Sequence, residues 1–213
     1  MKDQGGYEGR EVRRSSEELS RGVTRELFFP EKREAREGME ASEAAGLMGT
    51  VEQDAACWRQ TQGNMDSSAA CQEAVARSLL GGEFSPERLQ KCVQACESAG
   101  VRQSGDALEK MGLEVTRETG CGLKDICQVL GEGGKVIVRV NGAALRFAEY
   151  AKRPGIRADQ AVQVIGVDAR DPKQVMVIVN DPGASDGQAH SLPRQRFEKA
   201  WAVGDCAMTS VYR

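Results

Sequence analysis

A change in residue pattern at Gly134 constrains the fold of this chain more than any other feature. After it, short runs dense in β-branched residues alternate with turn residues, a pattern typical of strands. We predict strands over residues 135–140, 161–167, 175–179 and 207–212, with a helix over 194–201 before the last strand. Because helices come first and strands follow, we expect an α+β fold in which N-terminal helices pack on a C-terminal antiparallel sheet.

The helices are predicted from the spacing of apolar residues in the first half of the chain. Residues 68–80 place small and apolar side chains on one side at three- and four-residue spacing, and Gly81 follows as a C-terminal stop. Ser85 and Pro86 supply an N-cap and a first helical residue for a second helix that runs to Gly100. Two shorter helices are predicted over 106–111 and 123–130, with a short strand over 113–115.

The first 50 residues differ in composition from the rest of the chain. They are rich in Glu, Arg, Ser and Gly, and large apolar residues are sparse except around Leu27-Phe28-Phe29-Pro30. Such a segment buries too little apolar surface to offset the entropy lost on ordering. We therefore expect residues 1–50 to be a charged extension, flexible or partly helical, and residues 51–213 to form the folded domain.

The overall charge of the chain disfavours two kinds of partner, nucleic acid and anionic membranes. The 29 basic and 32 acidic residues give a net charge of −3, which provides no general field to hold nucleic acid or an anionic membrane. We find no apolar run long enough to cross a bilayer and no signal-peptide pattern at the amino terminus. We expect a soluble protein without membrane insertion, either cytoplasmic or exported by a route that needs no signal peptide.

Neither a disulfide framework nor a metal site is favoured by the cysteines. Their number, seven, is odd, and they are scattered through predicted helices and strands, so reduced thiols are expected. The single histidine, His190, lies in a Ser-, Gly- and Asp-rich segment and is expected to be a solvated loop residue. Cys92 and Cys96, four apart on a predicted helix, fit core positions. We expect no metal and no cofactor.

The C-terminal half carries a recognisable run of residues. It begins with Gln160-Ala161-Val162 and continues to Gly166-Val167-Asp168, and the next predicted strand ends in Asn180-Asp181-Pro182-Gly183. This resembles the C39-like group of papain-like cysteine peptidases, which includes bacteriocin-processing and staphopain-like effector relatives. The resemblance extends over about residues 57–213 and implies a papain-like (C39-like) fold.

The resemblance also implies a catalytic base and an orienting acid, and the base is missing. The family begins the first of these strands with His, in a His-Ala-Val-x-Val-x-Gly-x-Asp pattern, whereas this chain has Gln160 there. Asp181 stands where the family places the orienting Asp, and Asp-Pro-Gly is also strong turn chemistry. A thiol becomes a fast nucleophile when an imidazole takes its proton, and an amide cannot do so.

The position of the nucleophile is open between three residues. The family places an oxyanion Gln six residues before a nucleophilic Cys; without gaps this spacing matches Gln62 to the Gln and Ser68 to the Cys. Cys71, one helical turn further along, and Cys57, in a Cys57-Trp58 pair, are the alternatives. Buried or packing roles are the plain interpretation of both thiols.

These residues favour a catalytically degenerate peptidase that acts as a peptide- or protein-binding module, its partner lying between helix and sheet. An alternative is an active cysteine peptidase or acyltransferase, such as a bacterial effector, that uses Cys71 or Cys57 with a base such as His190. A second alternative is a structural subunit of a larger assembly. The sequence leaves the partner and the oligomeric state open.

Overall fold

The computed structural model describes residues 46–61, 66–99, 103–147, 149–150 and 155–213. Every described residue belongs to one compact unit, Met39–Arg213. The predicted extension therefore lies outside the described residues except for its last five.

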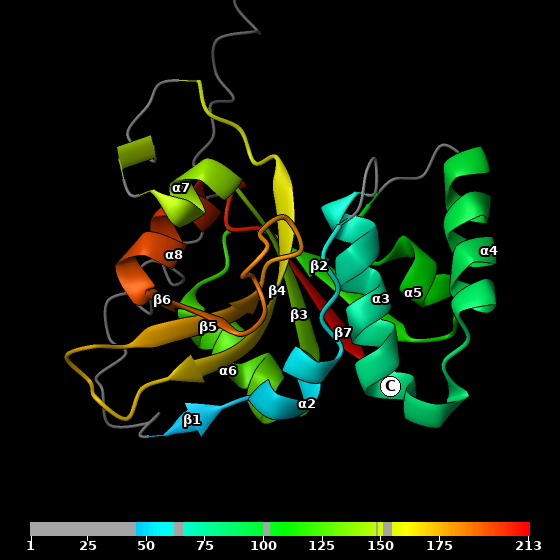
Figure 1. Cartoon of the computed structure of the whole chain (residues 1–213), viewed down its shortest axis with the longest axis horizontal. Helices are drawn as coiled ribbons and strands as arrows, with labels where there is room; N and C mark the ends of the chain where they lie inside the picture. Colours follow the sequence, from blue (N-terminus) through cyan, green and yellow to red (C-terminus); the bar gives the residue numbers. More distant parts are fainter. Residues whose placement is uncertain (1–45, 62–65, 100–102, 148, 151–154) are drawn as a thin grey trace, which may run out of the picture. The chain divides into compact units, whose positions relative to one another are not determined.

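The centre of this unit is an antiparallel sheet, shown with its covering helices in Figure 1. Within the described residues it has seven strands in the order β2-β7-β3-β4-β5-β6, and β1 pairs with the end of β4. The strands are β1 (Leu47–Met48), β2 (Glu114–Glu118), β3 (Lys135–Val140), β4 (Gln160–Asp168), β5 (Met176–Asn180), β6 (His190–Pro193) and β7 (Met208–Tyr212).

The helices precede most of the sheet in sequence, and the predicted α+β class is confirmed. They are α2 (Val51–Ala56), α3 (Ser67–Leu80), α4 (Pro86–Ser98), α5 (Asp106–Lys110), α6 (Leu123–Gly131), α7 (Gly142–Arg146) and α8 (Arg194–Ala202), with a 3-10 turn η1 (Gly81–Glu83) after α3. The predicted end of α3 is explained by Gly81, whose φ of 52° is a left-handed conformation that glycine adopts at low cost. Ser85 caps α4 as predicted, because its Oγ accepts from the N–H of Arg88.

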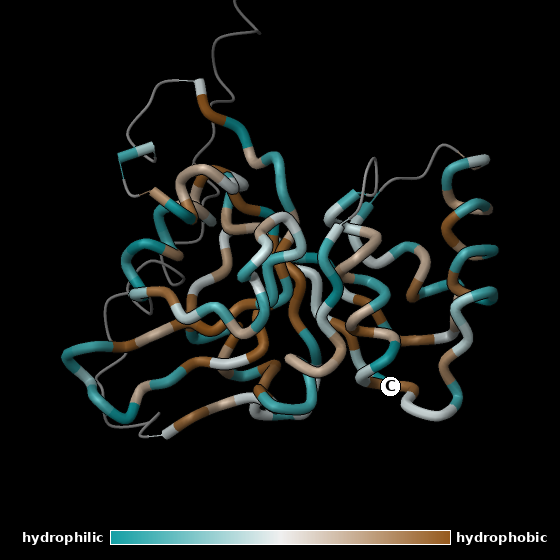
Figure 2. Tube along the Cα trace, viewed as in Figure 1, coloured by the Kyte–Doolittle hydropathy of each residue, from teal (hydrophilic) through white to brown (hydrophobic). Residues whose placement is uncertain are grey.

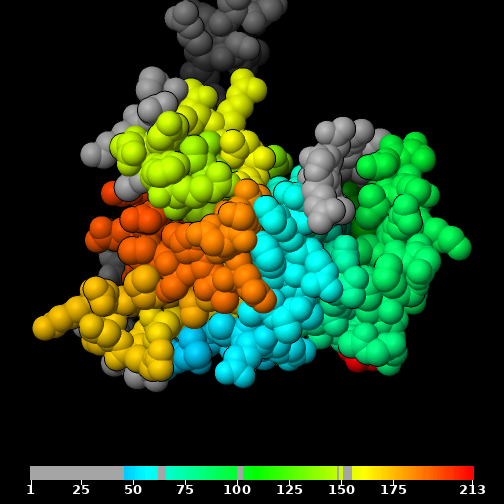
Figure 3. Space-filling model, viewed as in Figure 1, coloured from blue at the N-terminus to red at the C-terminus, as the bar shows by residue number. Residues whose placement is uncertain are grey.

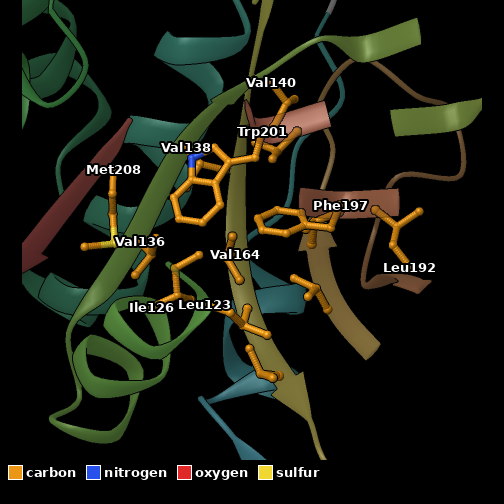
Figure 4. Close-up of a cluster of buried hydrophobic side chains, with 14 of the residues drawn as sticks. Leu123, Ile126, Val136, Val138, Val140, Val164, Leu192, Phe197, Trp201 and Met208 are labelled. Carbon is orange, nitrogen blue, oxygen red and sulfur yellow. The ribbon is translucent and has the colours of Figure 1, made fainter. Parts of the chain in front are cut away.

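The two faces of the sheet bury separate apolar clusters. Side chains alternate between the faces along a strand, so Val136 and Val138 point to one side and Ile137 to the other. The first side packs against α6, α7 and α8, with Phe197 and Trp201 at its centre (Figure 4). The second side packs against α3, α4 and α5. In Figure 2 the central strands are largely brown, as expected for strands covered on both faces.

Helix α2 is attached to the sheet by a buried ion pair. The Asp54 carboxylate and the Lys135 ammonium lie 2.9 Å apart, and both side chains are buried. Ser78 and Thr50 donate to the same carboxylate, and the Asn180 amide donates to the Asp54 carbonyl at 2.9 Å. These bonds satisfy charges that would be costly to bury alone.

The structure differs from the prediction in four short elements. The sequence pattern did not indicate β1, α2, α7 or β6, each of six residues or fewer. His190, expected in a loop, is the first residue of β6 and pairs with Val179 of β5, so that expectation is wrong. Residues 46–50, assigned to the extension, contain β1 and the N-cap of α2, so ordered structure begins before Val51.

Candidate functional site

The candidate site lies where β4 begins and β5 ends. Gln160 is the first residue of β4 and Asp181 directly follows β5. The side-chain amide of Gln160 donates to the Asp181 carboxylate, so the structure brings these two predicted site residues into direct contact. Asp181 is buried, with 1% of its surface exposed, whereas Gln160 is half-buried.

Arg146, at the end of α7, completes this arrangement. Its Nη2 donates to Gln160 Oε1 at 2.9 Å and lies 3.8 Å from Asp181 Oδ2. Two glycines leave room for the Gln160 amide: a β-carbon at Gly142 would clash with its oxygen, and one at Gly183 would lie 3.0 Å from its nitrogen. The amide is thus held from both ends and closely enclosed, as expected for a side chain with one fixed orientation.

The surroundings of Asp181 shift the pKa of its carboxyl group in opposite directions. Burial raises its pKa above the ordinary value, while the Gly183 amide, Arg146, His190 and Gln160 act in the opposite direction. Gly183 donates its N–H to Asp181 Oδ1 at 2.8 Å, which is the turn chemistry expected of Asp-Pro-Gly. The carboxylate thus orients a neighbouring side chain and closes its own turn.

The segment between α2 and α3 holds the main chain of the same turn. The Trp58 indole N–H donates to the Asp181 carbonyl at 3.1 Å, and Thr61 donates both its N–H and its hydroxyl to the Pro182 carbonyl at 2.8 and 3.0 Å. Figure 3 shows the cyan segment of the chain beside the orange loop that follows β5. Trp58 therefore anchors the site, which agrees with the packing role predicted for the Cys57-Trp58 pair.

The start of α3 meets β4 next to Gln160. Ser67, the first residue of α3, accepts a hydrogen bond on its Oγ from the N–H of Ala161 at 2.9 Å. Ser68, the predicted nucleophile equivalent, has its own N–H bound to the Asp66 side chain, and its carbonyl and hydroxyl oxygens lie 3.4 and 3.5 Å from the Gln72 amide nitrogen. The hydroxyl that contacts β4 is thus that of Ser67, one residue before the predicted position.

Cys71 lies on the same helix but is buried. Its exposed fraction is 1%, and it packs with Val75 in the cluster beneath α3. Burial raises the pKa of its thiol, and the negative charges of Asp181 and Asp66 raise it further. A thiol in this setting is protonated at neutral pH, in keeping with the predicted core role.

Cys57 and His190 are less buried than Cys71. Within the described residues no contact joins the two as a nucleophile and its base. Burial, with the nearby Asp54 carboxylate, raises the pKa of the Cys57 thiol. His190 interacts electrostatically with Asp181 from β6. Gln62, the predicted oxyanion residue, lies outside the described residues.

In the described part of the chain, no group of three or more His, Cys, Asp or Glu side chains could hold a metal ion. No helix there is both long and apolar enough to span a membrane. The polar groups of the site hydrogen-bond to one another. The side-chain amide of Gln160 carries no group that ionises in the neutral pH range.

Comparison with known proteins gives limited similarity. No protein family matches the sequence, and no curated protein matches it. Among solved structures, the fold is similar to the crystal structure of a candidate C39-like peptidase from Bacillus anthracis. The TM-score is 0.39 and the sequence identity 20%, over 51% of this chain and 56% of that chain. The similarity concerns the fold of about half of each chain, and it establishes neither a family nor an activity.

Proposed function

We propose that the chain is a catalytically degenerate papain-like peptidase of the C39-like type, which binds a peptide or protein segment instead of cleaving it. One observation carries the proposal: an amide, that of Gln160, donates to Asp181 where the fold would need an imidazole. Its carbonyl end is bound by Arg146. A carboxylate that orients an amide provides no general base, because the amide neither accepts nor releases a proton in this pH range.

The start of α3 supports the same conclusion. A cysteine peptidase needs an exposed thiol of low pKa at its nucleophile position. Here Ser67 and Ser68 occupy the first turn of α3, and the thiol on the same helix, Cys71, is buried and has a raised pKa. The hydroxyl of Ser67 already accepts the N–H of Ala161.

Peptide binding is the function that remains for such a site. The start of α3, the start of β4 and the loop after β5 present main-chain and side-chain polar groups within one region, and several of these side chains are only half-buried. Polar groups fixed in place by a rigid sheet bind extended peptides at low entropic cost. The partner would be a separate chain that lies across this region.

The test combines activity and thiol chemistry. Fluorogenic peptide panels should give no turnover with the full chain, and an electrophilic thiol probe should label Cys57 faster than Cys71, because Cys71 becomes reachable only on unfolding. Peptide mapping by mass spectrometry identifies the modified residue. Labelling of Cys71 in the folded protein, lost on His190→Ala, would contradict the proposal and support a peptidase that uses Cys71.

A matched pair of variants controls for unfolding. Cys71→Ala and Cys57→Ala should each leave peptide binding unchanged, since neither thiol is a contact in the proposed mode. The free energy of unfolding should fall for Cys71→Ala and change little for Cys57→Ala, because only the first is fully buried. A loss of peptide binding without a loss of stability in either variant would assign that thiol a direct role.

A further inference from the structure

We infer that the bound segment carries an acidic side chain, which Arg146 binds, next to an apolar side chain, which packs on Phe147. This inference rests on the proposed function, since it assigns the chemistry of the segment that binds at the same site. The surface concerned consists of Arg146, Phe147 and Gln160 and is called the Arg146 surface.

Arg146 has hydrogen-bonding capacity beyond its contacts within the chain. Of its guanidinium, only Nη2 has a partner in the described residues, through Gln160 Oε1 and, at 3.8 Å, the Asp181 carboxylate. A guanidinium has five N–H donors in a planar fork, so the Nη1 and Nε donors remain. The side chain is 38% exposed, which leaves this edge within reach of a ligand.

The positive charge of Arg146 and the negative charge of Asp181 lie at different depths below the protein surface. Asp181 is buried at 1% exposure and already accepts from Gln160 and Gly183, whereas the guanidinium above it is partly in solvent. A ligand that approaches from solvent therefore meets the positive group first. A carboxylate matches the fork of an arginine in both charge and geometry, and such bonds are about twice as strong as neutral ones.

An exposed aromatic ring adjoins this cation in sequence. Phe147 has 55% of its surface exposed and is one of two exposed large apolar residues in the described chain. Its ring lies 5.9 Å from that of Tyr150, in a tilted arrangement. An exposed apolar ring one residue along the chain from an exposed charged group matches a ligand that carries an apolar residue as well as an acidic one.

The bound segment should continue on both sides of Arg146. Gln160 connects Arg146 to β4, and the next residue of that strand, Ala161, donates to Ser67 at the start of α3. Figure 1 shows α7 and the start of α3 on opposite sides of the beginning of β4. The acidic group is therefore expected to be an Asp or Glu side chain within a segment, not a terminal carboxylate.

The experiment is selection from a random peptide library displayed on phage, with the full chain as bait. Enriched peptides are then synthesised in acetylated and amidated form, so that no terminal carboxylate is present, and their Kd is measured. We expect an Asp or Glu beside an apolar residue. Replacing that acid by its amide should weaken binding by about tenfold or more, as for a charge-assisted bond.

Variants of the chain separate a direct contact from a structural effect. Arg146→Gln should weaken binding of the acidic peptide and not of its amide version. The control Arg157→Gln removes the same charge from an exposed position in the nearby connection to β4 and should have little effect. Asp181→Asn should strengthen binding of the acidic peptide, because it removes the negative charge that partly compensates Arg146.

The outcomes distinguish this inference from the function on which it rests. Enriched peptides without an acidic preference, or equal Kd values for the acidic and amide versions, would overturn the inference and leave peptide binding standing. No enriched peptide at all would overturn both. If Arg146→Gln does not fold, the comparison of acidic and amide peptides on the unaltered chain still decides the matter.

Discussion

The main-chain N–H of Ala161 donates to the Ser67 hydroxyl at 2.9 Å, and this bond joins the start of α3 to β4 one residue beyond Gln160. Since Gln160 in turn contacts Asp181, three segments far apart in sequence meet at one place. The α3 side chain that bonds to this junction is thus that of Ser67. The predicted position, Ser68, lies about 100° further around the helix axis.

The first prediction concerns which residue of α3, Ser67 or Ser68, lies next to residue 160. In Ser67→Cys combined with Gln160→His, the new thiol should lie close to the new imidazole, and its apparent pKa should fall relative to Ser67→Cys alone. The same comparison at Ser68 should show a smaller change. Alkylation rates with iodoacetamide as a function of pH measure both.

The enclosure of residue 160 provides the control for that experiment. Gly142 and Gly183 leave little room around the Gln160 amide, so an imidazole has to take nearly the same place. Thermal melting should show whether Gln160→His alone is tolerated. Equal thiol pKa values in the single and double Ser67 variants, in a folded protein, would mean that residues 67 and 160 are not neighbours in solution.

The second prediction concerns the buried ion pair between Asp54 and Lys135. Lys135→Met leaves the carboxylate uncompensated in an apolar setting, and we expect it to lower the free energy of unfolding by about 3–5 kcal/mol. Asp54→Asn should cost a similar amount. The double variant should recover part of the loss, since no lone charge is then buried. Urea unfolding measures all three.

The half-exposed pair Arg77 and Glu73 is the matched control for this cycle. Their charged groups lie 2.7 Å apart on one face of α3, and their side chains are 29% and 24% exposed. Removing Glu73 by Glu73→Gln should cost about 0.3–0.5 kcal/mol, as for other pairs four residues apart. Comparable losses at the two pairs would show that burial of Asp54 is not what gives its ion pair a larger effect.

The third prediction is a pH dependence of stability caused by Asp181. Burial raises its pKa in the folded state above the ordinary 3.8. The folded protein then binds the Asp181 proton more tightly than the unfolded chain does, and this difference contributes to the free energy of unfolding. The contribution is fully present below pH 3.8 and is lost as the pH rises through the folded pKa. Asp181→Asn removes this loss.

The free energies of unfolding of the unaltered chain and of Asp181→Asn, measured by urea at a series of pH values, test the sign. Relative to the unaltered chain, Asp181→Asn should gain stability as the pH rises from about 4 toward neutrality. His190 interacts electrostatically with Asp181, so His190→Gln serves as the background for a second series. A difference that shrinks with rising pH would contradict a raised pKa.

The sequence predicted the sheet better than the site. β-Branched runs identified β3, β4, β5 and β7, because strands covered on both faces are apolar throughout. Lys135 was not recognised as buried, because its partner Asp54 is far away in sequence and lies on a helix that the pattern did not indicate. Short elements such as α7 have too few residues to show a period, and Arg146 was missed for that reason.

Within the site, the family pattern indicated the residues on the strands, and gapless spacing indicated the one on the helix. Gln160 and Asp181, which the family resemblance implied as site residues, lie at the ends of neighbouring strands, where pairing fixes the register, and their side chains are in contact. Along α3 a shift of one residue rotates the side chain to another face, and the cap at Asp66 sets that shift. Gapless counting cannot detect it, so Ser68 as the nucleophile equivalent stays a prediction, while the hydroxyl that contacts β4 is that of Ser67.

The fourth prediction concerns the boundary of the folded domain. We propose that most of residues 1–50 is dispensable for folding, as their composition predicts. The last of them are an exception, because Leu47 and Met48 pair with Asp168 and Val167 of β4, and Thr50 donates to Asp54. A chain that begins at Gly46 should therefore melt cooperatively near the temperature of the full chain.

A chain that begins at Val51 loses this pairing and the hydroxyl bond to the buried carboxylate. At about 1 kcal/mol for each net hydrogen bond, we expect its free energy of unfolding to fall by a few kcal/mol relative to the chain that begins at Gly46. Thr50→Val in the full chain separates the two causes, since it removes the hydroxyl and keeps the strand. Equal stability of the two truncated chains would mean that β1 contributes nothing. A strong loss already at Gly46 would instead assign the preceding residues a structural role.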